Sequence, residues 1–234
     1  MFPSPSFPLT AETWLRVGPY IPVLLRGLGV NIQILLGLIT LGFVVGILIA
    51  LLEVYAPRPL AFVGSAYAWF FRGVPEIVLL FLFYFGLSRT FNIPVSPFLA
   101  AVLALGLRSS AYQAQIFRGA LLSIPHGQMM AARALGLGPV RAIFHVILPQ
   151  ALRLSLAGWS NEFSSVLKDT TLAWGIGVVE VMRQAAYIRG RDFPLTLPIY
   201  LTVAFMFLVL TYAGNWAIGA VEKRLRVPGL ETRR

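Results

Sequence analysis

The sequence contains no cysteine and little charge. The lack of cysteine excludes disulfides and thiolate metal sites in this chain. Only 12% of the 234 residues are charged and 58% are hydrophobic, so there is too little charge to cover an apolar core with a polar shell. The apolar runs are continuous and roughly twenty residues long, about twice the length of the alternating segments of a membrane β-barrel. The composition therefore predicts an all-α membrane protein.

Other chemistry is scarce as well. The two histidines, His126 and His145, have no carboxylate at ligand spacing, so we expect no metal site. There is no G-x-x-x-x-G-K-[ST] phosphate loop, so we expect this chain to hydrolyse no ATP, to need no cofactor and to carry no catalytic residue. The net charge of +10 lies in short loops and the tail rather than on one face with exposed aromatics, which argues against nucleic acid as a partner.

Five apolar stretches are long enough to cross about 30 Å of hydrocarbon as helices. They cover residues 28–52, 60–87, 96–119, 151–182 and 195–219. The second is interrupted by Arg72-Gly73-Val74-Pro75-Glu76, which fits an interfacial helix followed by a span from Pro75, or one long tilted helix kinked here. We expect an external or interfacial segment over residues 1–27, a membrane domain over 28–221 and a tail over 222–234. The first residues lack the features of a signal peptide, so we expect a mature N-terminus.

Arginine and lysine are unevenly distributed between the loops, and this predicts the orientation of the spans. The loops after the first and third spans, together with the tail, hold Arg58, Arg118, Arg133, Arg141, Arg153, Lys223, Arg224, Arg226, Arg233 and Arg234. The remaining loops hold Arg89, Arg183, Arg189 and Arg191. The side with more cations is expected to be cytoplasmic, which places the N-terminus outside, the tail inside and residues 123–148 in the cytoplasm.

Small residues recur every four positions in the first span, at Gly42, Gly46 and Ala50. This spacing predicts a face on which another helix can approach closely. Glycines that simply face lipid are the alternative.

Three polar residues of the third span, Arg108, Tyr112 and Gln115, are spaced so that they share one helix face. Arg108 lies about twelve residues into the span, or about 18 Å at ~1.5 Å per residue, which is deep in the hydrocarbon. An ionisable residue at that depth predicts a functional site with a partner. The candidate partners are Glu76, Glu162 and a substrate carboxylate, and a purely structural ion pair with Glu162 is the alternative.

Lys168, Asp169, Thr170 and Thr171 interrupt the fourth span at depth. A broken helix in a membrane exposes backbone groups that only water or a protein-lined cavity can satisfy, which predicts that these residues line a pathway. A local pair between Lys168 and Asp169 that merely ends a helix is the alternative.

Residues 123–148 form the one sizeable polar segment between apolar runs. Residues 128–137 contain good helix formers, and Gly136 followed by Gly138-Pro139 predicts a turn before a second short helix. Two short helices cannot span a membrane, so their exposed apolar side chains would suit the groove of a soluble partner. An amphipathic pair resting on lipid headgroups is the alternative.

Several motifs resemble, in order, those of permease subunits of polar amino-acid ABC importers, and the resemblance covers about residues 27–221. They are Arg72-Gly73-Val74-Pro75, A-Y-x-A-x-I-x-R-G from Ala111, S-I-P-x-G-Q from Ser123, A-A-x-A-L-G-L from Ala131, I-L-P-Q-A from Ile147 and Lys168-Asp169-Thr170-Thr171-Leu172.

The resemblance implies a type I ABC importer permease fold with cytoplasmic coupling helices, in a bacterial cytoplasmic (inner) membrane. It implies import by alternating access, with an ATP-binding subunit that holds ATP and Mg²⁺, a substrate-binding protein and a second permease, a heterodimer being favoured and a homodimer possible. An autonomous secondary carrier or channel is the other function considered. The residues expected to dock to the ATPase are Gln128, Met130, Ala131, Ala132, Arg133, Leu135, Gly136 and Arg141.

Two positions depart from the pattern of that family. Met130 stands where the family usually has Glu, so docking is expected to depend on shape and on Arg133 or Arg141. Gln115 stands where a related motif usually has Glu, which favours a partner permease that holds the substrate more firmly. Arg-Gly-Val-Pro-Glu and Ser-Asn-Glu resemble the subgroup that serves histidine, arginine, ornithine or related solutes, so we expect a basic or polar amino acid. The residues expected along its pathway are Arg108, Tyr112, Gln115, Glu76, Glu162, Lys168, Asp169 and Thr170.

Overall fold

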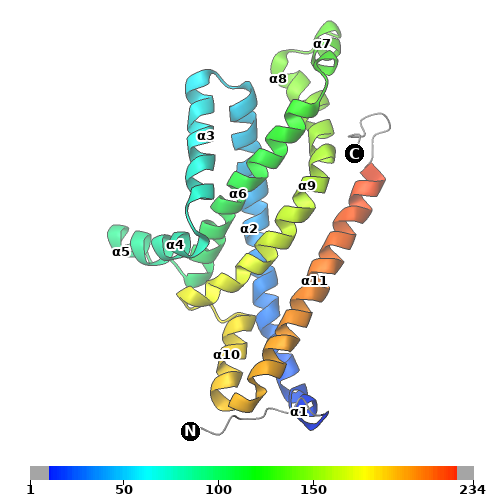
Figure 1. Cartoon of the computed structure of the whole chain (residues 1–234). Helices are drawn as coiled ribbons and strands as arrows, with labels where there is room; N and C mark the ends of the chain where they lie inside the picture. Colours follow the sequence, from blue (N-terminus) through cyan, green and yellow to red (C-terminus); the bar gives the residue numbers. More distant parts are fainter. Residues whose placement is uncertain (1–10, 226–234) are drawn as a thin grey trace.

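In the computed structural model, which describes residues 11–225, the chain is an elongated bundle of helices (Figure 1). Every element assigned within these residues is helical, as predicted: α1 (Ala11–Leu15), η1 (Gly18–Tyr20), α2 (Ile21–Tyr55), α3 (Arg58–Gly73), α4 (Glu76–Phe81), η2 (Leu82–Leu87), α5 (Ser88–Phe91), α6 (Pro97–Ser123), α7 (His126–Ala134), α8 (Pro139–Ala142), η3 (Ile143–Ile147), α9 (Leu148–Asp169), η4 (Thr170–Ile176), α10 (Val181–Arg191), η5 (Phe193–Leu195) and α11 (Thr196–Leu225). Residues 1–10, and residues 226–234 of the expected tail, lie outside the described residues.

The long helix α2 packs closely against α6. Gly42, Gly46 and Ala50 are buried on α2. A Cβ atom on Gly46 would lie 3.0 Å from the backbone oxygen of Ser110 in α6, so any side chain there would force the two helices apart by a few tenths of an ångström. The predicted face of small residues is therefore confirmed, and these glycines do not face lipid.

The predicted interruption between Gly73 and Glu76 is confirmed, but its geometry differs from both expected arrangements. α3 and the segment Glu76–Leu87 meet at a bend of 102°, which is too sharp for one tilted helix. The helix that lies along the bundle is α3, before the break, while α4 and α5 project sideways (Figure 1). Pro75 has no backbone N–H and disfavours helical geometry at Val74, so the helix ends there.

The central helix of the bundle is α6, which contacts α2, α3, α4 and α9. Its N-terminus is capped by Ser96, whose hydroxyl accepts a hydrogen bond from the Leu99 N–H at 3.2 Å. Many of its buried residues are small, among them Ala100, Ala104 and Gly106, so its neighbours approach closely. Because other helices cover it on several sides, α6 can carry polar side chains that would be costly against lipid.

The boundaries around the predicted fourth span need correction. Helical residues run without a break from Pro139 to Ile176, so α8 is the start of the long helix that contains α9 and not a separate short helix. The helix ends at Ile176 and not at Met182. Gly177 follows with a φ of +97°, which glycine adopts readily and which stops the helix.

Residues 183–191 belong to a helix, α10, and not to the predicted polar loop. The Glu180 carboxylate caps this helix by accepting hydrogen bonds from the N–H groups of Met182 at 3.0 Å and Arg183 at 2.8 Å. A narrow stripe of buried apolar residues, Val181, Ala185 and Ile188, is enough to hold α10 in place. The three arginines of this segment, Arg183, Arg189 and Arg191, led to the prediction of a polar loop, because they outweigh the short apolar stripe in the sequence.

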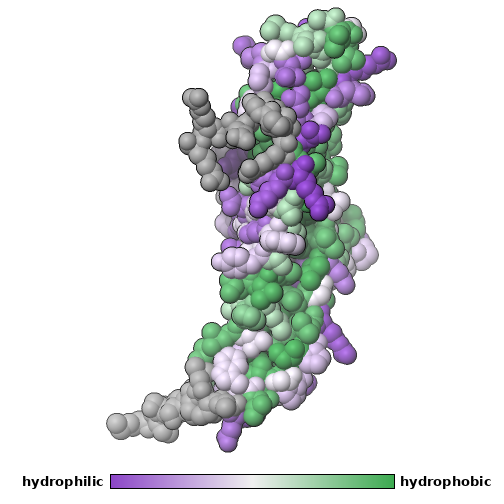
Figure 2. Space-filling view, turned by 90° about the vertical axis from the view of Figure 1, so that its right-hand side faces the viewer, coloured by the Kyte–Doolittle hydropathy of each residue, from purple (hydrophilic) through white to green (hydrophobic). Residues whose placement is uncertain are grey.

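Three helical stretches within residues 11–225 are long and apolar enough to span a membrane: Glu12–Tyr55, Pro139–Ile176 and Phe193–Leu225. A fourth is added when α3 and Glu76–Leu87 are counted as one broken span. The predicted third span, α6, is not among them, because its polar residues lower its hydropathy. Figure 2 shows apolar side chains over much of the middle and lower part of one face, as expected for helices that meet lipid.

Candidate substrate pathway and docking segment

Arg108 of α6 forms ion pairs with the first residue of α4 and the last residue of α9. These residues are Glu76 and Asp169, whose Oδ2 lies 3.3 Å from Arg108 Nη1. The side chain of Arg108 is only 14% exposed. Within residues 11–225, no group of three His, Asp or Glu side chains is placed to hold a metal ion.

The partners of Arg108 confirm one expectation from the sequence and correct two. The pairing with Glu76 is confirmed. The alternative pairing with Glu162 is wrong, because the Glu162 carboxylate accepts a hydrogen bond from the Ser109 hydroxyl at 2.7 Å. Ser109 follows Arg108 in the helix and points about 100° away from it. The local pair of Asp169 with Lys168 is also wrong, since Asp169 forms its ion pair with Arg108.

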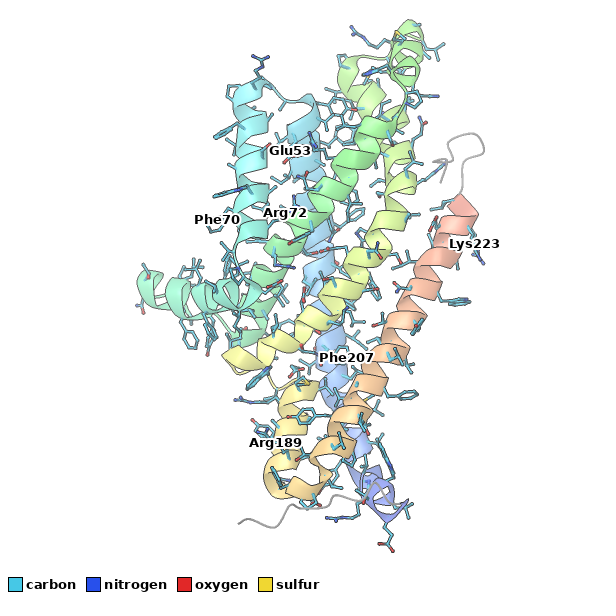
Figure 3. All side chains as sticks on the ribbon, viewed as in Figure 1. Glu53, Phe70, Arg72, Arg189, Phe207 and Lys223 are labelled. Carbon is cyan, nitrogen blue, oxygen red and sulfur yellow. The ribbon has the colours of Figure 1, made fainter. Side chains whose placement is uncertain are left out.

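The ring of Tyr112 lies close to two guanidinium groups. The Cζ atom of Arg108 is 4.6 Å from the ring centroid, and that of Arg72 is 5.1 Å away, both within the range of a cation–π interaction. Arg108 is neutralised by carboxylates. In the part of the chain that the structure describes, Arg72 forms no ion pair with a carboxylate. Arg72 therefore presents an uncompensated positive charge at the end of α3 (Figure 3).

A cavity of about 440 Å³ opens between α3, α6 and α9. It is lined by Arg72, Tyr112, Gln115, Ile116, Gly158, Asn161 and Glu162. Of the expected pathway residues, Tyr112, Gln115 and Glu162 line this cavity, whereas Arg108 does not line it but contacts the ring of Tyr112. Four lining residues were not predicted from the sequence: Arg72, Ile116, Gly158 and Asn161. Two of them lie beside predicted features, since Arg72 belongs to the helix-breaking motif and Asn161 adjoins Glu162.

Two residues expected along the pathway lie elsewhere. Thr170 is fully buried, and its hydroxyl accepts a hydrogen bond from the Asn31 amide at 3.0 Å. Asn31 also donates to the Glu180 carboxylate at 3.0 Å, so Thr170 belongs to a network that links α2, η4 and α10. Lys168 is exposed and does not line the cavity. The predicted interruption itself is confirmed, because the α-helix changes to a 3₁₀ turn after Asp169.

A carboxylate that sequence reasoning missed, Glu53 of α2, lies beside Gln115 (Figure 3 labels Glu53). The Gln115 amide donates hydrogen bonds to both oxygens of Glu53, at 3.2 and 3.1 Å. Arg118 Nε lies 3.2 Å from Glu53 Oε2, and the Glu53 side chain is only 4% exposed. The amide of Gln115 on α6 is therefore paired with the carboxylate of Glu53 on α2.

The segment from α7 to α8 projects from the end of the bundle opposite α10 (Figure 1). The expected docking residues Gln128, Met130, Ala131, Arg133, Leu135, Gly136 and Arg141 are exposed. Gly136 has a φ of +83°, which produces the predicted corner after α7. Ala132 is buried, because two residues along a helix turn it by about 200° from Met130, so it cannot contact a partner as predicted.

A charged cluster inside a bundle of apolar helices, an adjoining polar cavity and a projecting helical corner together describe a membrane transport component. The sequence matches the family "Binding-protein-dependent transport system inner membrane component" over residues 42–227. The chain belongs to this family. It is therefore an ABC transporter permease subunit of an inner membrane, and not the subunit that hydrolyses ATP. Membership implies an ATPase subunit, a binding protein and a second permease as partners.

Curated relatives are similar over most of their length. The L-cystine transport system permease protein TcyB of Bacillus subtilis (strain 168) is 35% identical over 217 residues, covering 92% of each chain. The glutamine transport system permease protein GlnP of Escherichia coli (strain K12) is 35% identical over 216 residues, covering 92% of this chain and 98% of the relative. The octopine transport system permease protein OccQ of Rhizobium meliloti is 34% identical over 212 residues, covering 86% of this chain and 89% of the relative.

Solved structures share the fold. The crystal structure of an amino acid ABC transporter with histidines matches with a TM-score of 0.80 and 32% identity, covering 90% of this chain and 98% of that one. The MetNI methionine ABC transporter in an inward-facing conformation matches with a TM-score of 0.76 over 90% of this chain and 99% of that one. At 23% identity, the second likeness concerns the fold alone.

Proposed function

We propose that the chain is the permease subunit of an ATP-driven amino-acid importer, and that the cavity beside Tyr112 receives the solute. The observation that carries this proposal is that Arg72, which has no carboxylate partner within residues 11–225, and the carboxylate of Glu162 line the same cavity. An amino acid at neutral pH carries one carboxylate and one ammonium group, so it complements both side chains. The names of relatives that transport cystine, glutamine and octopine support this class of solute.

The other polar groups of the cavity favour a solute with a polar or basic side chain. Gln115 and Asn161 contribute amides, and Tyr112 contributes an aromatic ring. An apolar side chain would remove these amides from water without replacing their hydrogen bonds, which costs free energy. The resemblance of the motif ending in Glu76, and of Ser160-Asn161-Glu162, to the subgroup for histidine, arginine and ornithine also supports this choice.

Arg108 with its two partners, Glu76 and Asp169, forms the Arg108 cluster, and we propose that this cluster changes its contacts during alternating access. Arg108 holds the beginning of α4 and the end of α9 against α6. Any movement that separates these elements must break at least one of its ion pairs. The cluster therefore favours one of the two access states, and ATP-driven movement of the subunits must supply the free energy to leave it.

The ATPase subunit is proposed to bind the corner formed by α7 and α8. Met130 and Leu135 are 67% and 84% exposed, which is unusual for large apolar residues outside a membrane face. A projecting short helix with such residues suits a groove in a soluble partner. Arg133 and Arg141 lie on the same exposed segment and offer cations to that partner.

We propose five membrane crossings, with the N-terminus outside and the C-terminus inside. In this arrangement α6 crosses the membrane sheltered by its neighbours, and α3 with α4 forms the second crossing in spite of its bend. The excess of arginine and lysine at the α7 end supports the orientation. A second permease would complete the pathway, and we favour a non-identical one, so that the two form a heterodimer.

The test is reconstitution of the chain in liposomes with an ATPase subunit, a binding protein and a second permease. Uptake of a labelled amino acid is expected to require ATP inside the liposomes and all partners. Stimulation of ATP hydrolysis across a panel of amino acids identifies the solute. Uptake by this chain alone, without ATP, would instead identify an autonomous carrier or channel.

Variants of the cavity test its role separately from assembly. Arg72→Gln and Glu162→Gln each remove one charged hydrogen-bonding group, so we expect the solute concentration for half-maximal ATPase stimulation to rise by about tenfold or more. Arg189→Gln on α10 is the matched control, since Arg189 is exposed at the other end of the molecule (Figure 3). Unchanged stimulation in both cavity variants would contradict the assignment of the cavity.

A further inference from the structure

A second cavity also borders α6 and α9 but is lined by other residues than the proposed solute site. Its volume is about 370 Å³, and α2, α6, α9 and the end of α11 form its wall. The lining residues are Ile39, Thr40, Phe43, Phe117, Leu152, Arg153, Ser155, Leu156, Trp159 and Leu225. This cavity shares no lining residue with the solute cavity.

The chemistry of the lining is apolar with one charged group at its edge. The hydroxyls of Thr40 and Ser155 are already used, since they donate to the backbone oxygens of Leu36 at 2.7 Å and Leu152 at 2.8 Å. The Trp159 indole N–H donates to the Gln113 side chain at 2.8 Å. The interior therefore presents hydrocarbon and aromatic surface, which does not suit a polar solute.

Positive charge gathers at one end of this cavity. Arg153 is exposed and forms no ion pair in the described part of the chain. Leu225, in the last turn of α11, also lines the cavity, and that turn carries Lys223 and Arg224 next to one acidic residue, Glu222. Figure 3 shows Lys223 near the end of α11, toward the end of the bundle that carries α7.

We propose that this cavity binds an anionic phospholipid, with an acyl chain against Phe43, Leu156 and Trp159 and the headgroup phosphate at Arg153. An apolar cavity between membrane helices accepts a hydrocarbon chain, and basic residues at its edge select a negative headgroup. A helix of a second permease would fit the apolar part equally, but it would not explain the unpaired cation of Arg153 in the cavity wall. The site is independent of the solute cavity and does not require the proposed function.

The experiment is native mass spectrometry of the assembled importer, released from nanodiscs that contain equal amounts of phosphatidylglycerol and phosphatidylcholine. The ratio of the two lipids retained on the 25.7 kDa permease chain is the measured quantity. We expect phosphatidylglycerol to predominate. Arg153→Gln should lower the ratio about fivefold, which corresponds to about 1 kcal/mol, the contribution of one basic residue near an anionic headgroup.

Two further variants locate the site. Leu156→Trp fills the cavity and should reduce retention of both lipids, while the exposed Arg189→Gln on α10 should leave the ratio unchanged. An unchanged ratio in Arg153→Gln would overturn the proposal, as would full lipid retention by Leu156→Trp. Selective binding that appears only after deletion of residues 226–234 would also overturn it, because the end of the chain itself would then be the occupant.

Discussion

The amide of Gln115 donates hydrogen bonds to both carboxylate oxygens of Glu53, at 3.2 and 3.1 Å. This contact gives a physical reason for an amide, and not a carboxylate, at position 115. A second carboxylate at position 115 would face Glu53 at hydrogen-bond distance, and Arg118 alone would have to offset both charges. In this chain α2 supplies the negative charge that α6 lacks.

Gln115→Glu is therefore expected to destabilise the chain. The substitution replaces two hydrogen bonds by repulsion between largely buried carboxylates, at a cost of about 1–3 kcal/mol. The double variant Glu53→Gln/Gln115→Glu exchanges the two groups, so one amide again faces one carboxylate and most of the loss should be recovered. Thermal unfolding of the purified protein measures both effects. A double variant as unstable as Gln115→Glu alone would show that the pair does not interact as described.

Arg108→Gln is expected to abolish transport and to lower stability. It leaves Glu76 and Asp169 without their shared partner, which costs about 1–3 kcal/mol for partly buried charges. Adding Glu76→Gln and Asp169→Asn removes the uncompensated charges, so stability should return while uptake stays low. Uptake by reconstituted liposomes and thermal unfolding distinguish the two effects. Normal uptake by Arg108→Gln would remove Arg108 from the pathway.

The sequence predicts the membrane class and part of the proposed site, but not how distant helices meet. Spacing within α6 is enough to place Arg108, Tyr112 and Gln115 on one face, because helix geometry is local. It cannot show that Asp169, and not Glu162, reaches Arg108, since that depends on how α9 is rotated against α6. Glu53 was missed for the same reason: its neighbour Gln115 lies on another helix, 62 residues away in the sequence.

Gly46→Ala tests the close contact between α2 and α6. The new methyl group would lie 3.0 Å from the backbone oxygen of Ser110, which cannot move aside without shifting the helix. We expect a loss of about 1–3 kcal/mol of stability from this overpacking. Gly29→Ala in the same helix is the matched control, because nothing lies within 4 Å of its added Cβ. The control should be neutral or stabilising by about 0.5–1 kcal/mol. Equal effects of the two substitutions would contradict the contact.

Asn31→Leu tests the buried network that joins α2 to α10. The substitution removes the donor to Thr170 and Glu180 and leaves the Val181 N–H without its acceptor. Thr170 and Glu180 keep their other hydrogen bonds, whereas the Val181 N–H would be buried without a partner, so we expect a loss of about 1–3 kcal/mol. Gln33→Leu, an exposed amide two residues along the same helix, should change thermal stability little. A small effect of Asn31→Leu would mean that water replaces its hydrogen bonds.

Gly136→Asp tests docking of the ATPase subunit. Gly136 has a φ of +83°, which glycine adopts more readily than any residue with a side chain, so aspartate adds modest strain as well as a charge at the corner after α7. The corner lies outside the bundle, so membrane insertion should be intact while co-purification with the ATPase is lost. Gly138→Asp controls for the added charge. Gly138 has φ −64° and ψ 160° at the N-cap of α8, where aspartate is favourable, so this variant should retain the ATPase. Retention by Gly136→Asp would refute the docking role of the corner, whereas loss in both variants would assign the defect to charge and not to shape.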